Sequence, residues 1–401
     1  MNKIQEGENM SKIFNIEEQT LKDLGGINTA REIYQQPEVW METLEIIKNN
    51  RERISNYIGK RLENKDLRII LTGAGTSAFV GEVAAPYLAR LLGKRVEAIH
   101  TTDIVSNPED YLEKEIPTIL VSFARSGNSP ESVATYNLGE NLIDDVGQLV
   151  ITCNKEGALA KKAEEDDKNL VILMPEKSDD KGFAMTSSFT SMLLTTITVF
   201  DMDNLDKNIE TMKYVANDAS KILSEASKDI FNLVKLNYDR VIYLGSSSLK
   251  GLARESALKG LELTSGKVIT SYDSVLAFRH GPKSIINDKT LVFMFMSNDE
   301  HARKYEVDLL KEISGDKGNH KVISITSERD KEVEENSYKM FVLSEECKNV
   351  KEVYLALDYI LYAQMFAFLY SKELGISPDN PRPDGTVNRV VKGVIIHEYN
   401  K

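Results

Sequence analysis

The sequence predicts an α/β protein made of two similar domains, each with a parallel β-sheet between layers of helices. Three observations support this fold class. Short apolar runs alternate with helical patterns along most of the 401-residue chain. The runs are continuously apolar, as expected of parallel strands that helices cover on both faces. Finally, the pattern of residues 68–92 recurs at residues 240–264: a strand that ends in Gly, then a turn of Gly, Ser or Thr, and then a helix.

Each element follows from a local pattern. The first 65 residues contain charged helical pieces, and Pro37 marks a helix start in QQPEVWMETLEIIKN. The strand LRIILTG (67–73) follows, and the helix SAFVGEVAAPYLARLLG comes after it. The other strands expected in the first half are VEAIHTT, TILVSF, QLVITC and NLVILM. In the second half we expect RVIYLG, VITSY, TLVFMFM, VISIT and KMFVL.

The alternation also predicts the domain organisation. Residues 1–60 form an N-terminal helical segment, residues 61–205 the first domain and residues 206–375 the second domain, which begins in a polar helical stretch. The last helix is expected over residues 353–374. The tail beyond it, residues 376–401, is rich in proline and should be extended and docked instead of helical.

Composition limits the class of protein. A net charge of −12 argues against a general nucleic-acid surface, because such surfaces need clustered Lys and Arg. The N-terminus lacks the apolar run of a signal peptide, and the most apolar long segment, residues 185–200, is too short to span a membrane. We therefore expect a cytoplasmic protein without membrane or nucleic-acid partners. Cys153 and Cys347 are expected to be reduced core thiols.

Two loops rich in glycine and hydroxyl residues follow strands of the first domain. In SFARSGNSPES (122–132), Pro130 fits the first position of a helix, so serine hydroxyls and free backbone N–H groups gather at a helix N-terminus. Arg125 adds positive charge, and Gly127 lets the backbone approach closely. The second loop is GAGTS (73–77). Both can converge on one anion, because ligands of open parallel sheets bind beyond the carboxyl ends of the strands.

Ordinary helix capping would explain a single loop of this kind, since Ser129 and Pro130 are common residues at helix starts. Two such loops together favour a phosphate site. GAGTS does not match the dinucleotide pattern GxGxxG, and the chain has no GxxxxGK[ST] motif. The sequence therefore favours a small phosphorylated metabolite over a nucleotide.

The second half carries the candidates for acid–base chemistry. In ARESALKGLELTSG, the residues Glu255, Lys259 and Glu262 are spaced to lie on one helical face, although a solvated surface ion pair would have the same spacing. His280 in FRHGPKS adds an imidazole, which can move protons at neutral pH. The other histidines have no comparable surroundings: His100, His301, His320 and His397. No spacing suits a metal, so we expect chemistry without a metal or cofactor.

Together these motifs resemble the sugar isomerase (SIS) family, whose members with two SIS domains bind phosphosugars. The resemblance covers about residues 60–395 and is carried by six ordered segments: LTGAGTSAFVGEVAAPYL, SFARSGNSPESVAT, GFAMTSSFTSMLL, YLGSSSLKGLARESALKGLELTSGK, FRHGPKS and GTVNRVVKGVIIH. They look like the branch of galactosamine-6-phosphate deaminase/isomerases, also called tagatose-6-phosphate ketose/aldose isomerases. The resemblance implies two tandem SIS domains, each a flavodoxin-like parallel sheet covered by helices on both faces.

The resemblance implies that the two loops hold a phosphate. The family's GTS turn falls on Gly75, Thr76 and Ser77. Its SxSGxT loop falls on a segment in which Ala124 replaces the first serine and Arg125 replaces an uncharged residue. The binding residues implied there are Arg125, Ser126, Gly127 and Ser129. The sugar-contacting positions fall near residues 184–186, and we expect Thr186 and Ser187 to contribute.

The resemblance also implies catalytic roles. Glu262 matches the proton-shuttling base, and Lys259 belongs to the same LKxxE motif. His280 matches the ring-opening residue, which is contributed across a dimer interface, and Lys392 matches the C-terminal lysine. The implied reaction converts D-galactosamine 6-phosphate to tagatose 6-phosphate and ammonia. The implied assembly is a homodimer or a higher homo-oligomer.

Two alternatives remain. A ketose/aldose isomerase would use the same groups on a phosphosugar without an amine. A phosphosugar sensor would keep the phosphate loops but could lose the acid–base set, whereas Glu262, His280 and Lys392 are all present. In addition, the acidic N-terminal segment does not look like a DNA-binding helix-turn-helix. An enzyme is therefore favoured over a sensor.

Overall fold

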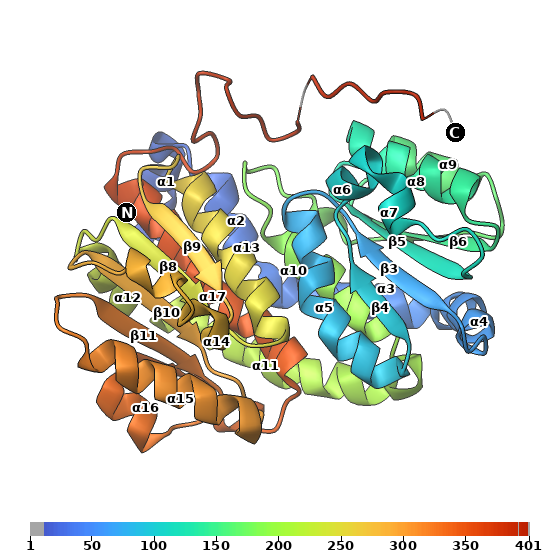
Figure 1. The fold of residues 1–401 in the computed structure, drawn as a ribbon. Helices are drawn as coiled ribbons and strands as arrows, with labels where there is room; N and C mark the ends of the chain where they lie inside the picture. Colours follow the sequence, from blue (N-terminus) through green and yellow to red (C-terminus); the bar gives the residue numbers. More distant parts are fainter. Residues whose placement is uncertain (1–11, 392, 400–401) are drawn as a thin grey trace, which may run out of the picture.

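The structure is a computed structural model that describes residues 12–391 and 393–399. Two five-stranded parallel sheets dominate it, with helices packed against both (Figure 1). The strand orders are β4-β3-β5-β6-β7 in the first sheet and β9-β8-β10-β11-β12 in the second. Each order is 2-1-3-4-5 in the sequence of its own half, which is the flavodoxin-like arrangement. The predicted α/β fold class is thus confirmed.

The first sheet contains β3 (Arg68–Thr72), β4 (Arg95–Ala98), β5 (Thr118–Ala124), β6 (Val146–Thr152) and β7 (Leu170–Leu173). Every residue of β3 and β5 is buried, which explains why these runs are continuously apolar. Its surrounding helices are α5 (Thr76–Leu92), α6 (Thr101–Ser106), α7 (Pro108–Tyr111), α8 (Pro130–Leu142), α9 (Ala158–Glu164) and α10 (Ser187–Val199). Ile70 and Leu120 pack towards α6 and α7, whereas Leu71 and Val121 face the main core with α5 and α10.

The second sheet contains β8 (Arg240–Leu244), β9 (Ile269–Asp273), β10 (Thr290–Phe295), β11 (Lys321–Thr326) and β12 (Lys339–Val342). One face packs on α14 (Val275–Phe278), α15 (Glu300–Gly315) and α16 (Lys331–Asn336). The other face packs on α11 (Leu205–Glu225), α12 (Ser227–Val234), α13 (Ser248–Leu263) and α17 (Glu352–Glu373). All ten strands that the sequence predicted are therefore present.

The N-terminal segment adds α1 (Glu18–Leu24), α2 (Ile27–Tyr34), α3 (Gln36–Asn49) and α4 (Arg51–Leu62). Pro37 lies in the first turn of α3, as expected. A short antiparallel hairpin of β1 (Lys12–Ile13) and β2 (Ile16–Glu17) precedes these helices and was not predicted. Four 3₁₀ turns complete the elements: η1 (Glu176–Ser178), η2 (Met202–Asn204), η3 (Pro282–Ile285) and η4 (Glu345–Cys347).

A single apolar core runs through both halves of the molecule. It includes Leu71 and Val121 of the first sheet together with Tyr243 and Phe293 of the second. Helix α17 is long and apolar enough to cross a membrane, a candidate that the sequence analysis missed. Its apolar stretch is completely buried inside the molecule, as in the core helix of a globular protein. Division of the chain into domains at residue 205 remains a prediction.

The two halves meet where α5 crosses α13. Gly251 of α13 lies so close to α5 that an added Cβ would stand 2.7 Å from the backbone of Glu82 and Val83. Only glycine allows this approach, because a side chain would force the helices apart. Each of these helices starts directly after the first strand of its own sheet. Lys259, about two turns beyond Gly251, contacts Thr76 at the start of α5, so the crossing places the start of α5 beside the C-terminal half of α13.

The tail beyond α17 contains no helix or strand over residues 377–391 and 393–399, as predicted, and turns and bends interrupt it between residues 378 and 390. Figure 1 shows the tail passing from the second half of the molecule towards α6 and α8 of the first half. Residues 394–399 and α8 line a groove of about 1170 Å³ there. Both cysteines are free thiols, as predicted; Cys347 is buried and Cys153 is partly buried.

Candidate active site

Helix α13 places three charged side chains in one cluster. The Lys259 Nζ lies 3.3 Å from Glu255 Oε1 and 2.6 Å from Glu262 Oε2. Glu255 and Lys259 are fully buried, while the Glu262 side chain is 24% exposed. The alternative of a solvated surface pair is therefore wrong. Burial of a lysine charge is tolerated only with close partners, which these carboxylates provide.

Lys259 also reaches the first half of the molecule. Its Nζ donates a hydrogen bond to Thr76 Oγ1 at 3.0 Å, across 183 residues of sequence. Thr76 begins α5 immediately after Gly75, whose φ of +57° is in the region that favours glycine. Ser77 follows, with its Oγ 3.8 Å from the sulfur of Met185. The GTS turn and the charged face of α13, predicted separately, thus form one site.

The two carboxyl groups of the cluster, Glu255 and Glu262, have different environments. Burial raises the pKa of Glu255 to about 8, although Lys259 opposes this effect. Burial alone would lower the pKa of Lys259, but the charges of Glu255 and Glu262 outweigh it and the pKa is raised. Near pH 7 the cluster therefore contains a protonated Glu255 and a charged Lys259. Glu262 is the carboxylate that both pairs with Lys259 and reaches solvent.

The loop at 122–132 starts α8 in the predicted way. Ser129 is the residue before the helix and Pro130 is its first residue. The Ser129 and Ser132 hydroxyls lie 2.7 Å apart, and the Ser126 hydroxyl accepts a hydrogen bond from the backbone N–H of Asn128. Gly127 has a φ of +67°. The hydroxyls are therefore held locally at the N-terminus of an α-helix, where an anion is favoured.

Arg125 connects this loop to two distant segments. Its guanidinium is almost completely buried and donates hydrogen bonds to the backbone oxygens of Phe183 (3.3 Å) and Arg389 (2.8 Å). Burial and the charge of Arg389 lower the pKa of Arg125, while the carboxylates of Asp180 and Glu262 oppose them. The guanidinium remains charged, since an arginine pKa starts above 12. A buried positive charge thus lies within the electrostatic reach of Glu262.

Thr186 and Ser187 make hydrogen bonds inside the protein. Both are fully buried. The Thr186 hydroxyl donates to Asp180 Oδ1 at 3.0 Å, and the Ser187 hydroxyl donates to the backbone oxygen of Glu32 at 2.6 Å. A sugar could contact these hydroxyls only after the bonds break. As described, the two residues hold the loop before α10 in place, and direct binding of substrate by them remains a prediction.

Sequence reasoning missed Asp180 and Glu32, which organise this loop. Asp180 accepts hydrogen bonds from the backbone N–H groups of Thr186, Ser187 and Ser188 at the start of α10. Glu32 of α2 accepts from the backbone N–H of Gly182, and burial followed by the charge of Asp180 raises its pKa to about 8. Neither spacing matches a common capping motif, so the sequence offered no signal for them.

His280, another predicted catalytic residue, lies apart from the cluster around Lys259. His280 is exposed just after α14, and no hydrogen bond or ion pair joins it to Lys259 or Glu262 among the residues that the structure describes. Lys392 lies outside the described residues. Arg389, three residues earlier, donates from its Nε to the backbone oxygen of Asp180 at 3.0 Å. The tail is therefore anchored beside Arg125.

One expectation about the histidines was wrong. His100 does have charged surroundings, because its Nε2 lies 2.8 Å from Glu82 Oε1, which also binds Arg254. Glu82 and Arg254 border a cavity of about 480 Å³ at the crossing of α5 and α13. Metal-ligating side chains group elsewhere: in the described part of the chain, the one such group is Asp218, Cys347 and Asp358, on α11, η4 and α17.

The chain is similar to known proteins over almost its whole length. The model of the SIS domain family matches residues 61–201. D-galactosamine-6-phosphate deaminase AgaS from Escherichia coli is 43% identical over 377 residues, which cover 93% of this chain and 96% of the relative. The protein of that name from Shewanella sp. (strain ANA-3) is 41% identical, covering 95% of this chain and 94% of the relative.

Solved structures show the same similarity. Tagatose-6-phosphate ketose/aldose isomerase from Escherichia coli is 41% identical with a TM-score of 0.86, covering 94% of this chain and 98% of that chain. A Clostridium novyi NT protein, for which the same isomerase activity has been suggested, is 47% identical with a TM-score of 0.94, covering 98% of this chain and 100% of that chain. The similarity includes the N-terminal segment as well as both sheets.

The raised pKa of Glu255 predicts a pH-dependent effect of Glu255→Gln. Between pH 4.5 and about 8 the folded protein holds a proton that the unfolded chain releases, so this group's contribution to stability falls as pH rises. Glutamine removes that dependence. The free energy of unfolding of the variant, relative to the original protein, should rise with pH by up to about 1 kcal/mol per unit across the window.

Urea unfolding at several pH values between 5 and 8 measures this difference. Glu210→Gln is the matched control, because Glu210 pairs with Lys213 at the surface and should give a difference that does not vary with pH. A pH-independent difference for Glu255→Gln as well would show that Glu255 is ionised throughout the window.

Proposed function

Because this chain belongs to the SIS domain family, in the group of the D-galactosamine-6-phosphate deaminases, we propose that it is a phosphosugar deaminase/isomerase. It converts D-galactosamine 6-phosphate to tagatose 6-phosphate and ammonia. The observation that carries the proposal is the hydrogen bond from Lys259 to Thr76, which joins acid–base groups to a phosphate loop. The 43% identity to a named deaminase supports the choice of substrate.

The first half of the molecule binds the phosphate. The turn at Gly75, Thr76 and Ser77 and the loop before α8 both offer backbone N–H groups and hydroxyls at helix N-termini. Arg125 supplies a buried positive charge beside them. Such a charge attracts a phosphate dianion strongly, because little water screens the interaction there.

The second half carries out the proton transfer. With the sugar ring open, Glu262 removes the proton at C2 and returns it at C1. The C1 oxygen gains a proton and the amine nitrogen loses one, which converts the aminoaldehyde to a C2 imine with a hydroxyl at C1. Water adds to the imine, and ammonia leaves to give the ketose. The charge of Lys259, buried 2.6 Å from Glu262, stabilises the negative charge that develops on the C1 oxygen through its electric field and without direct contact. The partial exposure of Glu262 lets it reach the substrate, whereas Glu255 is sealed inside.

Ring opening is assigned to His280 of a second copy of the chain. His280 is exposed and has no bond to the Lys259 cluster among residues 12–391 and 393–399, which supports delivery from a neighbouring subunit in a homodimer or larger homo-oligomer. A catalytic role of Lys392, which lies outside the described residues, belongs to the same proposal; Arg389, three residues earlier in the sequence, is bonded to the backbone oxygen of Asp180. The proposed location is the cytoplasm, since a charged phosphosugar does not cross a lipid bilayer unaided.

A second candidate function is ketose/aldose isomerisation without deamination. It is supported by the 41% identical structure that is named a tagatose-6-phosphate ketose/aldose isomerase. The same Glu262 would then move the proton between C1 and C2 of a sugar that has a hydroxyl at C2. The two functions differ in whether ammonia appears.

Incubation with galactosamine 6-phosphate, glucosamine 6-phosphate and tagatose 6-phosphate, followed by assays for ammonia and ketose, tests the proposal. We expect equal amounts of ketose and ammonia from galactosamine 6-phosphate. Glu262→Gln should lower turnover by about 10²–10⁴-fold while leaving phosphosugar binding intact. The control Glu210→Gln should keep full activity. Ketose without ammonia would support the isomerase, and binding without turnover of any of these sugars would support a sensor.

Replacement of Arg125 should weaken binding of the phosphosugar without slowing the chemical step. Arg125→Gln removes the buried charge, so KM for the phosphosugar should rise about 10–100-fold, as expected for loss of a hydrogen bond to a charged group. The kcat should change little, because Arg125 acts on the phosphate and not on C1 or C2. The exposed Arg329, changed to Gln, is the control and should alter neither constant. An unchanged KM for Arg125→Gln would contradict the assignment.

A further inference from the structure

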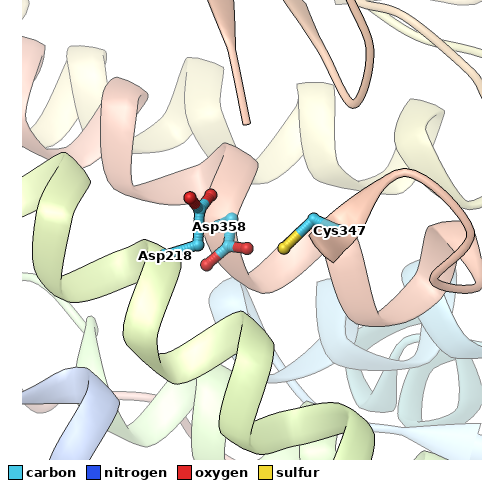
Figure 2. Close-up of side chains that lie close together, drawn as sticks. All are labelled: Asp218, Cys347 and Asp358. Atoms are coloured by element: carbon cyan, nitrogen blue, oxygen red, sulfur yellow. The ribbon is translucent and has the colours of Figure 1, made fainter. Parts of the chain in front are cut away.

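A second cluster of reactive side chains lies away from the candidate active site. Asp218 comes from α11, Cys347 ends η4, and Asp358 lies on α17. One ligand atom of each lies within 4.8 Å of the other two, and Figure 2 shows the three side chains close together. Asp218 is 3% exposed, and Asp358 and Cys347 are completely buried.

The carboxyl groups of this cluster are poorly satisfied by the protein. Asp218 Oδ1 accepts a hydrogen bond from the backbone N–H of Ser344 at 2.9 Å. Within the described residues, Asp218 Oδ2 and both oxygens of Asp358 have no hydrogen-bond partner. No lysine or arginine pairs with Asp358 there either. Buried carboxyl oxygens nearly always have hydrogen-bond partners, because an uncompensated one costs several kcal/mol. The unpaired oxygens of Asp218 and Asp358 therefore indicate that a ligand binds between them.

We propose that Asp218, Cys347 and Asp358 bind a zinc ion that fastens α11 to α17. Two carboxylates and one thiolate are oxygen and sulfur donors of the kinds that zinc accepts. The sulfur disfavours magnesium and calcium, which take oxygen ligands, and a single sulfur is too few for an iron–sulfur cluster. The fourth position of a tetrahedral site falls to a water or to the Ser344 hydroxyl, which lies 3.8 Å from the Cys347 sulfur.

The position of the cluster indicates a structural role. Helix α11 follows the first half of the chain and packs against the second sheet, and α17 is a core helix whose apolar stretch is completely buried. None of the three ligands bonds to Lys259, Glu262 or Arg125, so zinc would stabilise the fold without taking part in catalysis. The competing account is a proton retained on Asp358 with no metal. The two accounts predict opposite responses to added zinc.

The test uses full-length protein purified without chelators or a histidine tag. Metal analysis should find one zinc ion per chain, or one ion taken up after chelator treatment and addition of zinc chloride. Zinc addition should raise the thermal midpoint of the treated protein. Cobalt in place of zinc should give a thiolate-to-metal charge-transfer absorption band. Asp358→Asn should lower zinc affinity at least tenfold and abolish the thermal shift.

Variants of the two cysteines provide the matched comparison. Cys347→Ser should lose the cobalt charge-transfer band, whereas Cys153→Ser, at the free thiol of the first half, should keep it. A cobalt band that persists in Cys347→Ser would overturn the proposal. So would chelator-treated protein of the original sequence whose thermal midpoint does not respond to zinc, a result that needs no variant to fold and would support the protonated carboxyl group.

Discussion

The charge of Lys259 is the constraint on which the candidate site depends. A completely buried ammonium group needs close partners, and here it has Glu255 and Glu262 from its own helix and Thr76 from the other half of the molecule. This bonding is possible only because α13 and α5 approach each other at Gly251. The geometry of the phosphate turn at Gly75 is therefore tied to the position of the acid–base groups.

Buried polar groups also hold the segments that surround the contact between Lys259 and Thr76. Arg125 is also a buried cation, and it is held by backbone oxygens from the loop before α10 and from the C-terminal tail. Asp180 fixes that loop at the start of α10, and Glu32 links the loop to the N-terminal helices. Each segment that borders the site is thus held by a buried polar group, which positions the reacting side chains without requiring rigid loops.

Local patterns predicted most of the fold but only part of the site. The continuous apolar strands, Pro130 at the start of α8 and the shared face of Glu255, Lys259 and Glu262 all follow from short-range spacing. Burial of that face could not be predicted, because it results from packing against α5 in the other half. The same limit explains the missed contact of His100 with Glu82 and Arg254, and the unexpected use of Thr186 and Ser187 inside the protein.

The bond between Lys259 and Thr76 joins the two halves of the molecule at the candidate site. A double-mutant cycle of Lys259→Met and Thr76→Val, measured as free energies of unfolding in urea at neutral pH, tests it most directly. We expect a coupling energy of about 1–3 kcal/mol between the two side chains, the size typical of a buried hydrogen bond to a charged group. Effects that add to within about 0.5 kcal/mol would contradict it, because they would mean that the two side chains act independently.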